Sequence, residues 1–256
     1  MNSGTIVPVD NPNRPALPSK LWLGASTFSK ASRAKAIFNV HTDTGVSELL
    51  TPWKSGGASF RHRVYSSYEN YVAHQAAKLA SLDLRDYDTR YRAELRERLE
   101  RLNLLGRGDT VLCLAARIGT ECKAFIDLGC FAVGIDLNPG PDNAFVVRGD
   151  FHNLQFADES VNHVFTNSLD HAFDLERVLA EIVRVLKPGG NLIAEIVGGS
   201  KDSHGREPGE YESLWWDNAS DVVDAICRSG LMLVSKQRFD YPWSGELVVF
   251  GRPVRL

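Results

Sequence analysis

The sequence predicts a doubly wound α/β fold, in which helices cover both faces of a mostly parallel sheet. From Asp109 onward, short apolar runs alternate with helical segments, and the connections between them are short. This alternation is typical of a parallel sheet, because each strand needs a crossover, usually a helix, before the next strand can run the same way. We expect seven strands, of which the last two form an antiparallel hairpin: residues 111–115, 131–135, 144–148, 161–166, 191–197, 231–239 and 246–251.

The helices of this unit are predicted from apolar spacing and from capping residues. A helix over 120–128 ends at Gly129, a residue type that ends helices by adopting positive φ. Asp174 is a predicted N-cap, and the helix after it has its apolar residues on one face. The run Lys-Pro-Gly-Gly at 187–190 ends this helix, because proline cannot continue it. A further helix is expected around 215–229.

The segment ahead of this unit is predicted to form an arm and a cap. Four prolines among polar residues predict an extended arm over the first twenty residues. Residues 21–67 have no clean period, and we expect irregular structure packed against the rest of the chain. Aromatic and aliphatic residues at helical spacing predict helices over 65–83 and 87–102. We therefore divide the chain into an N-terminal arm and cap, residues 1–85, and a doubly wound domain, residues 86–256.

Composition and charge argue against several kinds of partner. The net charge is −3 and the sequence pI is about 6.2, so the chain lacks the electrostatic signature of a nucleic-acid-binding or anionic-membrane-binding protein. No apolar run approaches the roughly 20 residues needed to cross a bilayer, and the N-terminus does not resemble a secretory signal. The four cysteines have no CxxC spacing, so we expect core thiols and no metal site. We expect a cytoplasmic protein.

Candidate binding residues follow the carboxyl ends of the predicted strands, where open parallel sheets bind their ligands. Asp136 lies about 17 residues beyond Gly119, where an acidic side chain can bind the two hydroxyls of an adenosine ribose. The alternative for Asp136 is a turn or helix cap. Asp150 can bind the adenine amino group, and capping of its loop is an equally good interpretation.

The loop at 167–173, Asn-Ser-Leu-Asp-His-Ala-Phe, contains the candidate catalytic residue. His171 could act as a general base, because the ordinary pKa of histidine lies near neutrality. A histidine just before a helix can equally be a structural residue that makes hydrogen bonds. His152 is a weaker candidate, and Asp170 is expected to organise the loop or the cofactor.

These segments resemble the class I S-adenosylmethionine (SAM)-dependent methyltransferases, and among them the broad small-molecule group called type 11. The resemblance covers about residues 109–200 and is carried by VLCLAARIGTE, VGIDLNP, VVRGDFHNLQF, VNHVFTNSLDHAFDLERVLAEIVRVLKPGG and NLIAEIV. The combination of an L-D-H loop, an amphipathic helix and KPGG is its most specific part. The final helix and hairpin agree with the seven-stranded sheet of that family.

The resemblance implies a Rossmann-like methyltransferase fold with SAM as cofactor. It implies that Asp136 binds the ribose, that Asp150 and Phe151 lie near the adenine, and that residues 167–169 lie beside the methionyl part. N-terminal additions in this family cover the crevice and shape the acceptor pocket, although the aromatic residues here can also serve simply as core. The cofactor-binding residues predicted in this way are Ala115, Arg117, Gly119, Asp136, Leu137, Asp150, Phe151, Asn167, Ser168 and Leu169.

One loop departs from the family's pattern. The first loop of the family reads D-L-G-x-G-x-G, and the matching positions here are Cys113, Ala115, Arg117 and Gly119, so only the last glycine is kept. Arg117 would either extend into solvent or reach the carboxylate of the cofactor. Its charge would also disfavour a nearby sulfonium unless an acid pairs with it, and Glu121 is the closest acid in sequence.

The sequence therefore predicts a methyltransferase that acts on a hydroxyl, or an amine, of a small molecule or of a sugar or glycan. A hydroxyl acceptor must lose its proton during transfer, which is the role predicted for His171. An NAD-dependent oxidoreductase is disfavoured because the GxGxxG motif is absent. The main alternative is a methyltransferase-like binding or scaffold protein whose altered loop has lost the cofactor.

Overall fold

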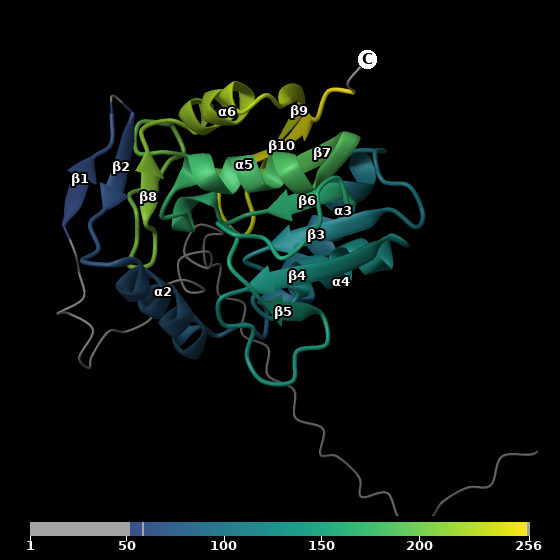
Figure 1. Ribbon diagram of the computed structural model, residues 1–256, viewed down its shortest axis with the longest axis horizontal. Coiled ribbons are helices and arrows are strands. Elements are labelled where there is room, and N and C mark those ends of the chain that lie inside the picture. Colours follow the sequence, from purple (N-terminus) through teal and green to yellow (C-terminus); the bar gives the residue numbers. More distant parts are fainter. Residues whose placement is uncertain (1–51, 58, 255–256) are drawn as a thin grey trace, which may run out of the picture.

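The computed structural model describes residues 52–57 and 59–254, and its centre is a seven-stranded sheet (Figure 1). The strands lie side by side in the order β5-β4-β3-β6-β7-β10-β9. The first five are parallel to one another, while β10 is antiparallel to both β7 and β9. The predicted doubly wound sheet with a closing hairpin is therefore confirmed. Its strands are β3 (Thr110–Leu114), β4 (Phe131–Asp136), β5 (Val146–Arg148), β6 (Val161–Thr166), β7 (Leu186–Val197), β9 (Met232–Phe239) and β10 (Gly245–Gly251).

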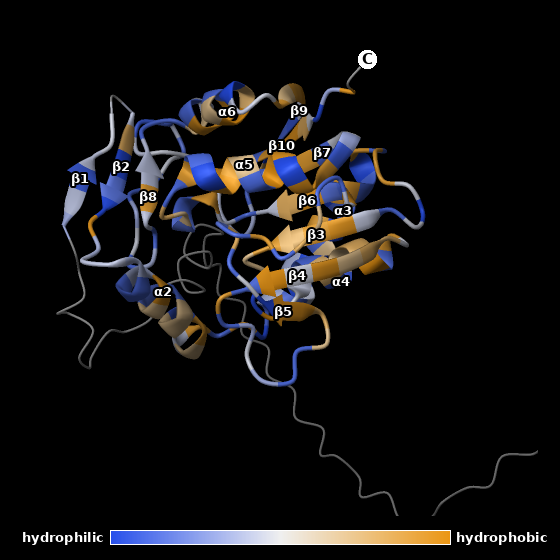
Figure 2. Ribbon diagram, viewed as in Figure 1, coloured by the Kyte–Doolittle hydropathy of each residue, from blue (hydrophilic) through white to orange (hydrophobic). Residues whose placement is uncertain are grey.

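Two pairs of helices cover the sheet, one pair on each face. Helices α3 (Arg92–Arg101) and α4 (Thr120–Asp127) share one apolar cluster with Val111 and Cys113 of β3. Helices α5 (Leu175–Val185) and α6 (Ala219–Arg228) share the other with Leu112 and Leu114 of the same strand. Alternate residues of one strand thus face opposite layers, as the pleat requires. Figure 2 shows apolar central strands beneath helices that are polar on their outer sides.

A second, three-stranded sheet lies beside the first and joins an early and a late segment of the described chain. Strands β1 (Trp53–Ser55) and β2 (Phe60–Arg63) pair with each other, and β2 also pairs with β8 (Leu214–Trp216). Helix α2 (Tyr68–Ala77) follows and continues as a 3₁₀ turn, Lys78–Ser81. We call β1, β2, α2 and this turn the cap.

Two predictions in these regions are wrong. Residues 53–55 and 60–63 are strands, not irregular structure, and residues 215 and 216 belong to β8 instead of a helix. The partners β2 and β8 are about 150 residues apart in the chain, so local pattern could not reveal their pairing. Helix α6 begins later, after a capping box formed by Asn218 and Asp221. The predicted arm, residues 1–20, and most of 21–67 lie outside the described residues.

The Lys-Pro-Gly-Gly run also differs from its prediction. Helix α5 begins at Asp174, whose side chain accepts from the Arg177 amide, as expected for an N-cap. It ends at Val185, and β7 begins directly after it, so the run is an irregular start of a strand. The Gly189 amide donates to Arg252 at 2.9 Å and the Arg252 amide donates to Gly190 at 2.8 Å. These bonds to the far end of the chain extend the strand backwards.

The helices before β3 follow their predictions with small changes. The helix predicted over 65–83 is shorter, because only α2 and its 3₁₀ turn are regular. The helix predicted over 87–102 begins as a π-helical turn, Tyr87–Tyr91, and continues as α3. In the part of the chain that the structure describes, no helix is long and apolar enough to cross a membrane.

Candidate functional site

A pocket lies at the carboxyl ends of β3, β4 and β6, and residues of the cap close one side of it. This edge of the sheet is where the sequence predicted the cofactor site. Its wall contains residues from the loops after these strands and one face of α2 with its 3₁₀ turn. The lining residues are Tyr71, Gln75, Lys78, Leu79, Ala115, Arg117, Ile135, Asp136, Leu137, Asn138, Gly149, Phe151, Ser168 and His171.

The loop between β3 and α4 makes a sharp turn at the pocket. Ala115 and Arg117 have φ angles of 53° and 43°, in the left-handed region that favours glycine. Ala115 and Arg117 stand where the family has glycines, and the backbone keeps the left-handed conformation at both positions. Gly119 has φ of 79°, and a Cβ added to it would lie 2.7 Å from Cβ of Phe145. The one kept glycine is the position at which a side chain would not fit.

Asp136 binds this loop to the end of β4. Its Oδ2 accepts from the Arg117 amide at 2.9 Å, and its Oδ1 accepts from the Asn138 amide at 2.8 Å. Burial raises the pKa of the carboxyl, while the two amides and the Arg117 guanidinium act in the opposite direction. Asp136 thus makes the turn contacts that its structural interpretation requires, and its side chain also faces the pocket that the functional interpretation requires.

The guanidinium of Arg117 does not extend into solvent. It lies with its central carbon 5.5 Å from the centre of the Tyr87 ring, and it lines the pocket. Burial lowers the pKa of Arg117, but Tyr87 and Glu121 more than offset this, so the pKa is raised overall. Among the described residues, the buried Nη1 of Arg117 and Oε2 of Glu121 have no hydrogen-bond partner. Each therefore has capacity for a ligand.

A buried polar network behind this loop was not predicted. The Tyr87 hydroxyl donates to Glu121 and the Tyr91 hydroxyl donates to Glu195, each at 2.7 Å. Asn167 donates to Tyr87, Tyr91 and Glu121 at 3.1, 2.9 and 3.1 Å. The side chain of Asn167 therefore orders this network. The tyrosines lay on a predicted apolar helix stripe, and only the acids on the facing elements identify them as polar partners.

Asp150 also has several partners. It accepts hydrogen bonds from the Tyr68 hydroxyl and from the His152 amide, and its Oδ1 lies 2.8 Å from His152 Nδ1. Burial raises the pKa of Asp150, but these hydrogen bonds outweigh it and the pKa is lowered. Phe151 lines the pocket and Asp150 lies just outside its lining. Leu169 is buried in the core next to the lining residue Ser168.

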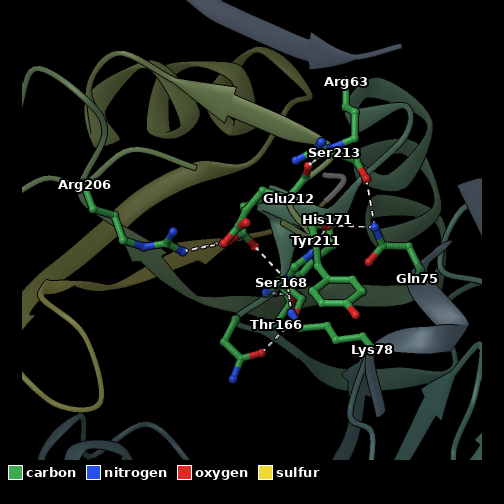
Figure 3. Close-up of polar contacts among 12 residues, drawn as sticks. Arg63, Gln75, Lys78, Thr166, Ser168, His171, Arg206, Tyr211, Glu212 and Ser213 are labelled. Atoms are coloured by element: carbon green, nitrogen blue, oxygen red, sulfur yellow. Dashed lines mark hydrogen bonds and ion pairs between the residues drawn. The ribbon is translucent and has the colours of Figure 1, made fainter. Parts of the chain in front are cut away.

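His171 lies in the pocket wall and is in contact with Lys78. The two side-chain nitrogens, His171 Nε2 and Lys78 Nζ, are 2.6 Å apart (Figure 3). Tyr71, which also lines the pocket, lies on the helix that was expected to cover the crevice, but the sequence prediction missed Gln75 and Lys78. A signal existed, since these residues follow one another at helical spacing of four and three positions and so share a face.

Comparison with known proteins agrees with this architecture. The family described as "Methyltransferase domain" matches residues 112–194. This segment is similar to the type 11 group of class I methyltransferases. The matched segment begins in β3 and ends in β7, and it contains the loop, Asp136 and the Asn167–His171 segment. SAM is the cofactor of that family, so the predicted family and cofactor are confirmed at this level.

The chain also matches individual relatives. Demethylmenaquinone methyltransferase of Paenarthrobacter aurescens is 35% identical over 96 residues, which are 34% of this chain and 38% of that protein. Sterol 24-C-methyltransferase of Eremothecium gossypii is 26% identical over 196 residues, which are 66% of this chain and 45% of that protein. The chain thus spans less than half the length of these relatives.

Solved structures share the fold. The 1,6-didemethyltoxoflavin-N1-methyltransferase of Burkholderia thailandensis, solved with S-adenosylhomocysteine (SAH), superposes with a TM-score of 0.58 at 16% identity, covering 78% of this chain and 99% of that one. A [4+2]-cyclase superposes with a TM-score of 0.53 at 14% identity, covering 63% of this chain and 81% of that one. Because one fold serves both reactions, the chemistry must be argued from the pocket.

Proposed function

We propose that this chain transfers the methyl group of SAM to a hydroxyl, or an amine, of a small molecule or of a sugar or glycan. The observation that carries the proposal is the Asp136 carboxylate, which lines the pocket and is fixed there by two backbone amides at 2.9 and 2.8 Å. A carboxylate can accept about four hydrogen bonds. Lone pairs therefore remain for the two hydroxyls of a ribose. Phe151 and Leu137 supply apolar surface for the adenosine beside it.

Arg117 is the proposed contact for the amino-acid end of the cofactor. Its buried Nη1 has no partner among the described residues, and a carboxylate would satisfy it. Glu121 compensates part of its positive charge from the protein side. Ala115, Gly119, Ser168 and the backbone around Leu169 would complete the cofactor site. The altered loop is then a different way of holding SAM and not evidence that SAM binding is lost.

The acceptor would enter beside Ser168 and His171. The work of the site is to hold donor and nucleophile in line and to exclude water, since methyl transfer from a sulfonium neutralises charge. A hydroxyl acceptor also needs its proton removed, and the contacting pair of His171 and Lys78 lies where that proton would be taken up. The methyl supplied by bound SAM is the only group transferred.

Calorimetric titration with SAM, SAH and 5′-methylthioadenosine tests the cofactor site. We expect micromolar binding of SAM and SAH, weakened about 100-fold or more in Asp136→Ala, because charged hydrogen bonds to the ribose are lost. Arg117→Met should weaken SAM and SAH about tenfold and leave 5′-methylthioadenosine unchanged, because that ligand lacks the amino-acid end. Asp158→Ala is the matched control, since Asp158 pairs with Arg184 at the surface.

The outcomes separate the proposal from its alternative. Equal affinity in Asp136→Ala and Asp158→Ala would show that Asp136 does not hold the ribose. Absence of any SAM or SAH binding to folded wild-type protein would favour the scaffold interpretation, in which the altered loop has abolished the cofactor site.

A further inference from the structure

The pocket contains a lysine whose amine contacts an imidazole. Lys78 lies in the 3₁₀ turn after α2, and His171 lies in the loop after β6, so two distant segments bring the groups together. The Nζ–Nε2 distance of 2.6 Å is that of a short hydrogen bond, and both residues line the pocket (Figure 3).

The position of the hydrogen on His171 follows from the hydrogen bond that its Nδ1 makes. Its Nδ1 lies 2.8 Å from the backbone oxygen of Tyr211, which can only accept, so Nδ1 carries the hydrogen. Burial and the charge of Lys78 lower the pKa of His171, so the imidazole is neutral near pH 7. Its remaining lone pair, on Nε2, therefore accepts a hydrogen bond from Lys78. The imidazole then has no free lone pair for an acceptor in the pocket.

The Lys78 amine, by contrast, forms no ion pair with a carboxylate in the described part of the chain. None of the ion pairs within 4.0 Å found in residues 52–57 and 59–254 includes its Nζ. The nearby acids Glu212 and Asp170 lie 2.8 and 3.6 Å from Arg206, which engages them. A neutral amine in this position would donate one N–H to His171 and keep its own lone pair available.

The charged groups around Lys78 come from three other segments. Arg117 from the β3–α4 loop and Arg206 from the loop before β8 lower the pKa of Lys78, whereas Glu212 and Asp170 raise it. Burial is the largest effect, and the resulting pKa of Lys78 is about 7. Much of the amine is thus neutral at physiological pH, as a general base requires.

We propose that Lys78 is the catalytic base of the methyl transfer and that His171 is a positioning residue that holds its amine. This assignment rests on the proposed function. The acceptor hydroxyl gives its proton to neutral Nζ while its oxygen forms a bond to the methyl carbon. The carbon–sulfur bond breaks and its electron pair stays on sulfur, which leaves SAH. Lys78, now an ammonium, returns the proton to solvent. His171 therefore acts through Lys78, whose amine it holds in place.

A base that is neutral also resolves the charge conflict in the pocket. SAM carries a positive sulfonium and SAH carries a neutral thioether, and the two ligands are otherwise alike. A protonated Lys78 would oppose the sulfonium and not the thioether. By linkage, SAM should lower the pKa of Lys78 more than SAH does, and SAM should bind more weakly as the pH falls.

Two measurements that need no acceptor test this base. The first follows the ¹³Cε signal of Lys78, in protein labelled with [¹³Cε]lysine, from pH 5.5 to 11 and assigns it with Lys78→Met. We expect a midpoint near neutrality, moved upward by Arg117→Met and downward by His171→Phe, which removes the hydrogen-bond acceptor for the ammonium. A merely structural His171 would leave this midpoint unchanged.

The second measures the ratio of SAH to SAM dissociation constants between pH 6 and 8.5. The shared amino-acid end cancels in this ratio. In wild type, we expect the affinity for SAM to fall about tenfold relative to that for SAH at pH 6. The ratio should not depend on pH in Lys78→Met. In Lys78→Arg it should be unfavourable to SAM at every pH. Lys236→Met is the control, because Lys236 pairs with Glu246 on the hairpin and should behave as wild type.

A Lys78 midpoint near 10, or a ratio that does not change with pH in wild type, would overturn the assignment. Failure of both ligands to bind wild type would refute the proposed cofactor site, while the ¹³Cε titration still reports on Lys78 by itself. Once a methyl-accepting compound is found, Lys78→Arg should keep SAH binding and lose turnover at least about 100-fold. Wild-type turnover in that variant would also overturn the assignment.

Discussion

At the scale of the residue, the buried Lys78 amine lowers the free energy of unfolding of the protein. Its pKa falls from 10.5 to about 7 on burial beside Arg117. The unfolded chain therefore binds more protons at this position than the folded chain does between pH 7 and 10.5. Stability rises with pH wherever the unfolded state binds more protons. The destabilising effect of Lys78 is thus complete below about pH 7 and disappears above about pH 10.5.

This dependence of stability on pH gives a prediction for Lys78→Met. The variant should raise the free energy of unfolding by about 1–2 kcal/mol at pH 6, and the gain should shrink steadily towards pH 10. Urea unfolding at pH 6, 8 and 10 measures the difference from wild type. Lys236→Met, on the exposed hairpin, should show no such trend. A difference that stays constant with pH would mean that Lys78 keeps an ordinary pKa.

At the scale of the element, the β3–α4 loop combines a left-handed backbone with residues that have side chains. Ala115 and Arg117 both have positive φ, a conformation that costs a non-glycine residue roughly 1 kcal/mol or more. Asp136 holds the turn by accepting from the Arg117 amide at 2.9 Å. The loop thus keeps the backbone geometry that glycines give to the family, and it adds the Arg117 side chain to the pocket.

The loop predicts opposite effects for two neighbouring alanines. Ala115→Gly should stabilise the protein by about 0.5–1 kcal/mol and keep SAM affinity, because glycine relieves the positive φ. Ala116→Gly should destabilise it by a similar amount, since Ala116 is buried and is not among the residues with positive φ. Thermal unfolding and calorimetry of both variants provide the comparison. Destabilisation by Ala115→Gly would contradict the strained-loop account.

At the scale of the whole molecule, the cap and the proposed doubly wound domain share one small sheet. Strand β8 belongs to the later part of the chain, yet it pairs with β2 through Phe60–Trp216, Arg61–Trp215 and His62–Leu214. Arg63 donates to the backbone oxygens of Glu212 and Gly209, both at 2.8 Å. The pocket depends on the same arrangement, because Lys78 of the cap and His171 of the domain meet in it.

The proposed division between residues 85 and 86 can be tested on this basis. We expect the fragment 86–256 to unfold about 10 °C or more below the full chain, because Trp215 and Trp216, both buried, lose the strand that pairs with β8. The fragment lacks Trp22 and Trp53, so the reference is the full-length protein with both Trp22→Phe and Trp53→Phe. Relative to this reference, the fluorescence of the fragment should shift to the red. Unchanged stability and emission would identify 86–256 as an independent domain.

Several features of the candidate site could be predicted from sequence and several could not. Asp136 at the end of its strand, and the positions of Ser168 and His171 in the loop after β6, followed from strand patterns and from the family resemblance. The side chains that contact these residues could not be predicted in this way. Lys78 is about 90 residues from His171 in the chain, and the network of Tyr87, Glu121 and Asn167 likewise joins separate elements.

The motifs of the sequence indicated the family. The sequence by itself also determined the order of strands and helices in the seven-stranded sheet, the doubly wound fold and the edge of that sheet at which the pocket lies. Local spacing and capping encode these features, because they depend on residues a few positions apart. Only the tertiary structure decided that β8 pairs with β2, that the Lys-Pro-Gly-Gly run joins a strand, and that Lys78 meets His171. Pairing partners and pKa values depend on which distant groups become neighbours and how deeply they are buried, and a local pattern contains neither.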